Sequence, residues 1–281
     1  MQQQDRGAGR SDAPDAYDVW AMGHAYEPYV GRWSRAVARA CIHWLALPPG
    51  RRWLDVGCGT GAVSQTILDV AAPREVVGVD ASAGFVAYTR QQVVDGRARF
   101  EVADAQALPY DAGSFDAAVS GLVLNFIPRP DEALAEMARV VAAGGTVAVY
   151  VWDYAGAMQF MRHFWDAAVA LDPAAQALDE GVRFPLCQPE ALQALFRDAG
   201  LANVAVRAID APTVFRDFDD YWGPFLGGQG PAPGYVASLD DARRVALRER
   251  LRAALPHAAD GSIPLIARAW AVRGVRRLLW H

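Results

Sequence analysis

The alternation of short apolar runs with helix-like segments limits the fold of this chain most strongly. Runs rich in β-branched or apolar residues recur at 51–57, 75–80, 98–104, 115–121 and 146–152. Alternating strands and helices are typical of a parallel sheet with crossover helices. Two further strand candidates follow, at 201–210 and 263–275. The sequence therefore predicts an α/β fold with a mostly parallel sheet and helices on both faces.

The composition argues against several classes of function. The 281 residues carry a net charge of −5 and no dense basic run, whereas a nucleic-acid partner requires a positive footprint. All 27 basic residues are arginines, so a Walker-type phosphate loop and a Schiff-base mechanism, which both need lysine, are excluded. The three cysteines match no metal or disulfide spacing, so we predict no metal site and a reducing compartment.

The distribution of polarity along the chain indicates one elaborated domain. The first residues are polar, and no apolar run reaches the roughly 18 residues of a membrane span. We therefore expect a cytoplasmic protein with no membrane span, a disordered tail at 1–14 and a single domain at 15–281. The oligomeric state cannot be predicted from the sequence.

The stretch WLDVGCGTGAV at 53–63 places three glycines directly after the first apolar run. A glycine-rich turn between a strand and a helix lets backbone N–H groups approach a ligand closely. The spacing would also satisfy a loose dinucleotide fingerprint, so a nicotinamide-dependent oxidoreductase is one alternative. Asp55 favours another ligand, because a carboxylate suits an amino group or a sulfonium better than a pyrophosphate.

These motifs resemble those of the class I S-adenosylmethionine-dependent methyltransferases, across about residues 50–152. LDVGCGTG looks like the first motif of that family, in which the acid, here Asp55, lies near the methionine amino group of the cofactor. Asp80 in VVGVD matches the acid that holds both ribose hydroxyls, and Asp104 with Ala105 in VADAQALPY matches the adenine-binding positions. The stretch FDAAVSGLVLNFI at 115–127 matches the fourth strand and its loop, where Ser120 and Asn125 are candidates for contact with the methionine end.

Each of these acids also has a structural alternative. Asp80 would instead cap the next helix, Asp55 would end a strand in solvent, and Asp104 would only start a turn. The position of Asp80, about 20 residues after the glycines, fits a ribose-binding acid. The complete set of predicted cofactor-binding residues is Arg32, Asp55, Gly57, Cys58, Gly59, Gly61, Asp80, Ala81, Asp104, Ala105, Gln106, Ser120 and Asn125.

The resemblance further implies a seven-stranded sheet whose last strand is antiparallel, in the style of ubiquinone and menaquinone C-methyltransferases. Similar enzymes close an N-terminal helical segment over the cofactor, so we assign 15–48 to a cap and 50–152 to the cofactor-binding core. Arg32 in that cap is a candidate for the cofactor carboxylate. Aromatic-rich insertions at 153–190 and 212–260 are expected to form a lid and line the acceptor pocket, although core packing is the alternative for their aromatic side chains.

The predicted reaction is methyl transfer from S-adenosylmethionine to an O, N or C nucleophile of a small, apolar or aromatic acceptor, leaving S-adenosylhomocysteine. His163 and His24 are weak candidates for a base, because alignment and exclusion of water supply much of the acceleration of such a displacement. The lack of a convincing base leaves a non-catalytic S-adenosylmethionine-binding regulatory protein as a second alternative.

Overall fold

A computed structural model describes residues 32–227 and 230–277, except the side chain of Arg32. Seven strands form one sheet in the order β3-β2-β1-β4-β5-β7-β6. The strands are β1 (Arg52–Val56), β2 (Glu75–Asp80), β3 (Ala98–Val102), β4 (Phe115–Gly121), β5 (Val141–Trp152), β6 (Ala202–Phe215) and β7 (Ile263–Val275). Neighbours among β1 to β5 pair in parallel, and β7 runs antiparallel to both β5 and β6. The predicted sheet, including its antiparallel last strand, is confirmed.

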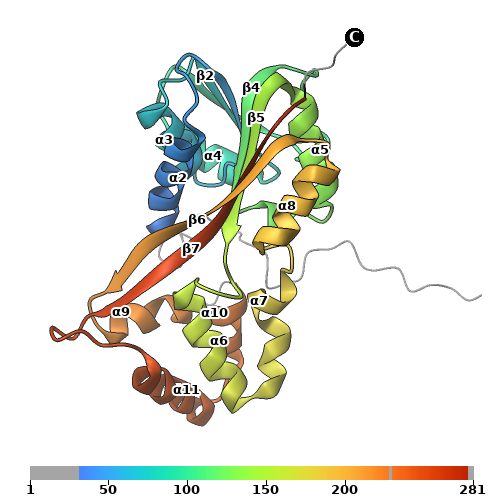
Figure 1. Cartoon of the computed structure of the whole chain (residues 1–281). Coiled ribbons are helices and arrows are strands. Elements are labelled where there is room, and N and C mark those ends of the chain that lie inside the picture. Colours follow the sequence, from blue (N-terminus) through green and yellow to red (C-terminus); the bar gives the residue numbers. More distant parts are fainter. Residues whose placement is uncertain (1–31, 228–229, 278–281) are drawn as a thin grey trace, which may run out of the picture.

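Helices lie on both faces of this sheet, as predicted (Figure 1). Helices α2 (Arg32–Leu45) and α3 (Ala62–Val70) pack together beside one face, and α5 (Pro130–Val140) and α8 (Pro189–Asp198) lie beside the other. Helix α4 (Ala83–Gln92) packs on β2 and β3. The central residues of β1, β2 and β4 are mostly apolar and buried, which is typical of a parallel sheet covered on both faces.

The remaining helices gather at one end of the molecule, beside the far halves of the long strands β6 and β7 (Figure 1). They come from the two predicted insertions, one after β5 and the other after β6. They are α6 (Gln159–Leu171), η3 (Pro173–Leu178), α7 (Glu180–Arg183), α9 (Phe218–Trp222), η4 (Gly223–Leu226), α10 (Pro231–Ser238) and α11 (Asp241–Ala254). We call this group the helical subdomain.

An aromatic core holds the helical subdomain together. The rings of Phe160 and Phe164 stack on Phe225 with centroids 4.6 and 4.4 Å apart. The ring of Trp33 meets Phe160 at 5.4 Å, edge to face, and so connects the subdomain to α2. The three phenylalanines are fully buried. These phenylalanines of the 153–190 and 212–260 insertions therefore form packing contacts. Each ring pair contributes about 0.5–1.5 kcal/mol beyond area burial.

None of the helices within the described residues is both long and apolar enough to cross a membrane.

Candidate functional site

The glycine turn joins β1 to α3 through three residues in the left-handed region. Gly57, Gly59 and Gly61 have φ values of 75°, 50° and 88°, which cost a residue with a side chain about 1–2 kcal/mol each. The backbone N–H of Gly57 donates to the Val79 carbonyl over 2.8 Å, so the turn is tied to the end of β2. A Cβ at Gly57 would lie 2.6 Å from Val123 Cγ1, so close packing as well as conformation requires glycine there.

Asp80 ends β2 beside this turn, and two backbone groups fix its carboxylate. The N–H of Gly59 donates to Oδ2 over 3.0 Å, and the N–H of Ser82 donates to Oδ1 over 2.8 Å. Burial raises the pKa of Asp80, and the two hydrogen bonds oppose that shift. The Ser82 hydroxyl, and not Asp80, caps α4 by accepting from the N–H of Phe85 over 3.3 Å. The carboxylate is therefore oriented by the glycine turn, with lone pairs left for a ligand.

A pocket of about 440 Å³ opens at the carboxyl ends of β1, β2 and β4, where ligands lie in open α/β sheets. Its lining is mostly apolar and includes the glycine turn, Asp80 and the residues Leu122, Val123 and Phe126 that follow β4. The described lining residues are Ser34, Gly57, Cys58, Gly59, Thr60, Ala62, Val63, Asp80, Ala81, Ser82, Phe85, Gly121, Leu122, Val123, Phe126 and Tyr150. Of the predicted cofactor-binding residues, this set brings together Gly57, Cys58, Gly59, Asp80 and Ala81.

Asp55 lies behind the pocket lining and is fully buried, so it does not end its strand in solvent. The Ser64 hydroxyl donates to Oδ2 over 2.6 Å, whereas Oδ1 is buried without a hydrogen-bond partner among the described residues. Burial raises the pKa of Asp55 to about 7, Ser64 opposes the shift, and the charge of Asp80 adds to it. An unsatisfied buried carboxylate oxygen costs more than about 1–3 kcal/mol, so a donor from a bound ligand or its water would stabilise the site.

Two further predicted residues leave buried polar atoms unpaired in the described part of the chain. Ser120 at the end of β4 is fully buried, and its hydroxyl has no partner there. The side-chain amide nitrogen and oxygen of Asn125 in η2 (Leu124–Phe126) are also buried and have no partner there. Neither residue is among those that line the pocket, and their predicted contact with the methionine end remains a prediction.

The predicted adenine-binding residues form a local turn outside the pocket lining. Asp104 Oδ1 accepts from the backbone N–H of Gln106 over 2.8 Å, and Gln106 Oε1 accepts from the N–H of Arg129 over 3.1 Å. The pairing fits the turn alternative, but the backbone N–H of Ala103 also bonds the Asp80 carbonyl, which keeps the turn next to β2. The adenine role of Asp104, Ala105 and Gln106 stays a prediction, as does a cofactor contact for Gly61.

Only one of the two candidate bases, His163, belongs to the described residues. His163 is half-buried on α6, where burial lowers its pKa, and it does not line the pocket. His24 and the side chain of Arg32 lie outside the described residues. Burial raises the pKa of the Cys58 thiol far above its usual range, so the thiol stays protonated. No group of three or more metal-ligating side chains occurs in the described part of the chain.

Sequence reasoning missed the apolar side of the pocket. Leu122 follows β4 with φ of 64°, a strained conformation for leucine, and its N–H donates to the Tyr150 carbonyl over 2.8 Å. Phe126 meets Phe184 of the 153–190 insertion edge to face, with ring centroids 5.1 Å apart. The place of Leu122 and Phe126 directly after the fourth strand could have marked them as pocket residues. No local sequence pattern separates Tyr150 from its neighbours in β5.

Comparisons with known proteins point to one family. Residues 54–149 match a family described as a methyltransferase domain. The chain is 33% identical over 181 residues to the demethylmenaquinone methyltransferase of Roseiflexus castenholzii, covering 59% of this chain and 74% of that protein. It is 37% identical over 132 residues to the demethylmenaquinone methyltransferase of Renibacterium salmoninarum, covering 47% and 50%. It is 29% identical over 250 residues to the 2-methyl-6-phytyl-1,4-hydroquinone methyltransferase of Synechocystis sp., covering 80% and 77%.

The match spans about half of the length of several curated relatives, with coverage of 50%, 52% and 54%. Among solved structures, the fold is similar to that of Haemonchus contortus phosphoethanolamine N-methyltransferase 2 in complex with phosphomonomethylethanolamine and S-adenosylhomocysteine. The TM-score is 0.58 at 17% identity, over 91% of this chain and 57% of that chain. The three relatives above are all named as methyltransferases, which favours methyl transfer over nicotinamide-dependent oxidation or a purely regulatory role.

Proposed function

The chain belongs to the S-adenosylmethionine-dependent methyltransferases, and we propose that it transfers a methyl group from S-adenosylmethionine to a ring carbon of a small hydroquinone-type acceptor. The observation that carries the proposal is one pocket lined both by a glycine turn with a fixed Asp80 carboxylate and by the apolar side chains of Leu122, Val123 and Phe126. Relatives named for demethylmenaquinone and hydroquinone methylation support this class of acceptor.

The residues present fit the proposed cofactor. Asp80, oriented by two backbone N–H groups, would accept hydrogen bonds from both ribose hydroxyls. A Cβ at Gly59 would meet nothing closer than 4.0 Å, so the turn leaves open space for the ligand above it. The unpaired Oδ1 of Asp55 would receive the methionine ammonium, directly or through water. When bound, the cofactor supplies a methyl group already activated by the positive sulfonium.

The contribution of the protein would be alignment and exclusion of water. Leu122, Val123 and Phe126 would hold a flat acceptor against the methyl group. For each methyl group that the bound cofactor would supply from its sulfonium, the ring carbon would lose one proton to a base or to water. Phe184 packs against Phe126 and extends the apolar lining. Neither the described lining nor the sequence identifies a dedicated base.

The wider sequence predictions are part of the same proposal. We infer one methyltransferase domain at 15–281 in which the helical subdomain serves as lid and acceptor-side wall. The net charge of −5 supports the absence of a nucleic-acid partner. The free, buried Cys41, Cys58 and Cys187 support a cytoplasmic location.

Titration calorimetry with S-adenosylhomocysteine tests the cofactor half of the proposal. Asp80→Ala should weaken binding by about tenfold or more, because a charged hydrogen-bond acceptor contributes about 1.5–3 kcal/mol. The control Asp131→Asn changes an exposed carboxylate in the first turn of α5 and should leave the affinity within about twofold. Equal affinity in Asp80→Ala and the wild type would contradict the proposed ribose site.

The acceptor half requires a separate assay with the labelled methyl donor and a reduced demethylmenaquinone analogue. We expect product with the label on a ring carbon and none when the ring position is already methylated. Labelled product on a phenolic oxygen alone would contradict ring methylation while leaving cofactor binding intact.

A further inference from the structure

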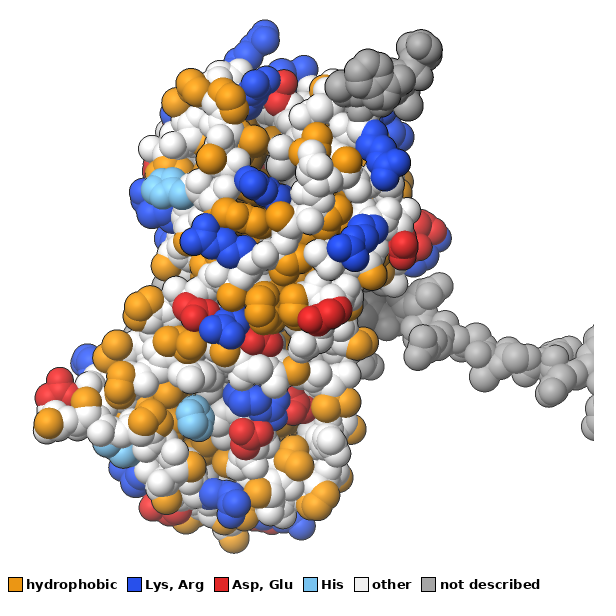
Figure 2. All heavy atoms as spheres, viewed as in Figure 1, with side chains coloured by type: hydrophobic (Ala, Val, Ile, Leu, Met, Phe, Trp, Pro, Cys, Tyr) orange, Lys and Arg blue, Asp and Glu red, His pale blue; other side chains and the backbone are white. Residues whose placement is uncertain are grey.

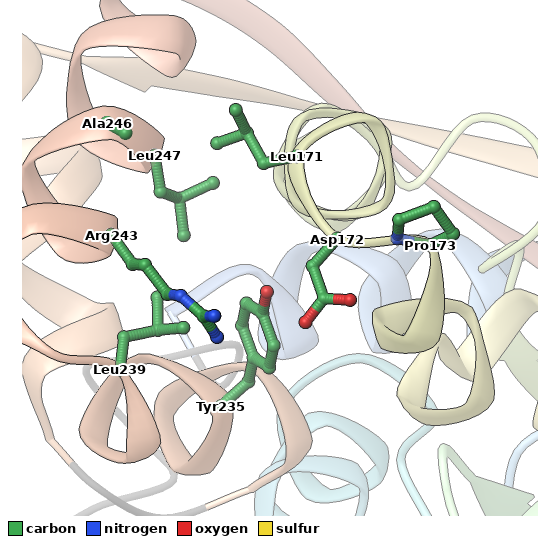
Figure 3. Close-up of a pocket in the computed structure, with 8 residues that line it drawn as sticks. All are labelled: Leu171, Asp172, Pro173, Tyr235, Leu239, Arg243, Ala246 and Leu247. Atoms are coloured by element: carbon green, nitrogen blue, oxygen red, sulfur yellow. The ribbon is translucent and has the colours of Figure 1, made fainter.

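A second pocket of about 270 Å³ lies in the helical subdomain, apart from the cofactor pocket (Figure 3). Its walls come from the end of α6, the start of η3, α10 and α11, and none of its lining residues lines the cofactor pocket. The lining residues are Leu171, Asp172, Pro173, Tyr235, Leu239, Arg243, Ala246 and Leu247. The volume lies just below the usual range of roughly 300–1,000 Å³ for ligand sites, which favours a small ligand.

Tyr235 supplies the first sign that this pocket receives a ligand. The ring is largely buried, with only 7% of the residue exposed, and Tyr235 lines the pocket. Figure 3 shows the hydroxyl pointing into the pocket between Arg243 and Asp172. Burial raises the pKa of Tyr235, the charge of Asp172 adds to the shift, and Arg243 opposes it, so both charges act on this hydroxyl. A tyrosine hydroxyl both donates and accepts hydrogen bonds, so at this place it can bond a polar group of a bound molecule.

Arg243 and Asp172 place opposite charges on the same pocket without pairing to each other. Asp172 Oδ1 accepts from the N–H of Ala174 over 3.1 Å, which caps η3 and leaves Oδ2 for another donor. The guanidinium of Arg243 has its nearest carboxylate, that of Asp240, at 3.7 Å, and both side chains are largely exposed. Such an exposed pair contributes little, so the guanidinium can exchange it for a ligand.

The apolar part of the lining completes the recognition pattern. Leu171 is 45% exposed at the pocket, and Leu247 is fully buried behind it. A ligand with only a negative charge would face the Asp172 carboxylate, and a ligand with only a positive charge would face the Arg243 guanidinium. A molecule that carries both charges and a short apolar group satisfies all three features.

We propose that this pocket binds a free apolar α-amino acid as a zwitterion. The ligand carboxylate bonds the guanidinium of Arg243, and its ammonium bonds Asp172 Oδ2 and the Tyr235 hydroxyl. The aliphatic side chain lies against Leu171 and Leu247. Arginine suits this role because its planar donors match a carboxylate.

Titration calorimetry on the full chain with L-leucine as the probe tests the proposal. We expect saturable binding with a Kd of millimolar or tighter. The analogues 4-methylpentanoate, which lacks the ammonium, and 3-methylbutylamine, which lacks the carboxylate, should each bind about tenfold more weakly. Absence of binding of L-leucine at ten millimolar would overturn the proposal, and equal binding of either analogue would overturn recognition of a zwitterion.

Variants locate the site. Arg243→Gln and Asp172→Asn should each weaken L-leucine binding by about tenfold, and asparagine preserves the cap of η3. The matched control Arg250→Gln changes an exposed arginine of α11 outside the pocket and should not change the affinity. Loss of L-leucine binding in Arg250→Gln, or its retention in both pocket variants, would overturn the placement. Binding of S-adenosylhomocysteine should be equal in all four proteins, so failure here is distinguishable from failure of the proposed function.

Discussion

The Ser64 hydroxyl donates a hydrogen bond to Asp55 Oδ2 over 2.6 Å and leaves Oδ1 of the same carboxylate without a partner among the described residues. Asp55 lies near the end of β1 and Ser64 on the first turn of α3, so the glycine turn separates them in the sequence. The proposed cofactor would bring a positive charge to the unpaired oxygen. Cofactor affinity and the protonation of Asp55 should therefore be linked.

We expect S-adenosylhomocysteine to bind more tightly as the pH rises through about 7. The pKa of Asp55 is raised from 3.8 to about 7, mainly by burial, so the carboxyl is partly protonated at neutral pH. The ammonium of the ligand favours the ionised form, and a rising pH supplies that form. Calorimetry at pH 6 and pH 8 should show the difference, whereas Asp55→Asn should bind weakly and equally at both values.

A ligand without the amino group provides the control for this linkage. Methylthioadenosine keeps the ribose and adenine but lacks the amino-acid part, so its affinity should not rise between pH 6 and pH 8. An equal rise for both ligands would assign the pH dependence to another group, such as Asp80, whose pKa is also raised by burial.

The central part of the fold and site could be predicted because its signals are local. A strand followed by glycines at φ-positive positions fixes the turn, and the parallel register that pairs Val56 with Val79 brings Gly59 next to Asp80. The ends of most strands were also predicted within two residues. The fifth strand is longer than predicted, because it begins at Val141, where the chain pairs with Phe115 directly after α5. The sixth strand is also longer, because its pairing with β7 continues to Phe215, past the predicted start of the second insertion at 212.

Other parts of the site depend on packing between distant segments, which a single sequence does not reveal. Ser64 looked like any polar residue of a helix, and it meets Asp55 only because α3 packs on the sheet. Tyr150 reaches the pocket because the register of β5 places it opposite Gly121. The pocket of the helical subdomain joins Asp172 to Arg243 across about seventy residues, with no motif to mark it.

Glu180 should make the folded state less stable as the pH rises from about 4.5 to about 8. Its side chain is buried, and burial raises its pKa to about 8 although the Trp165 indole N–H donates to it. A carboxyl whose pKa is raised by folding stabilises the protein below its unfolded pKa, and this contribution is lost through the folded pKa. Urea denaturation should show a larger loss of stability between pH 6 and pH 8 in the wild type than in Glu180→Gln.

The control for this measurement is Glu190→Gln, an exposed glutamate in the first turn of α8. It should keep the pH dependence of the wild type. An identical pH dependence in Glu180→Gln and the wild type would show that the carboxyl does not titrate in this range.

Two glycines with nearly equal φ separate backbone strain from close packing. Gly57 and Gly50 have φ of 75° and 77°, but an added Cβ would lie 2.6 Å from Val123 at the first and in open space at the second. Gly50→Ala should therefore cost about 1–2 kcal/mol from strain alone. Gly57→Ala should cost about 1–3 kcal/mol more from overpacking. Chemical denaturation measures both, and equal losses would contradict the close contact with Val123.

Phe184 should affect the acceptor and not the cofactor. Its ring contacts Phe126 edge to face at 5.1 Å, Phe126 lines the pocket, and neither ring belongs to the glycine turn. Phe184→Ala should raise the KM of a hydroquinone acceptor by about threefold to tenfold, because the aromatic pair stabilises the wall by about 0.5–1.5 kcal/mol. The Kd of S-adenosylhomocysteine should stay within about twofold. Val182→Ala, a change at an exposed residue of the same insertion, should alter neither value. A loss of cofactor affinity in Phe184→Ala equal to the rise in acceptor KM would instead assign the insertion a general structural role.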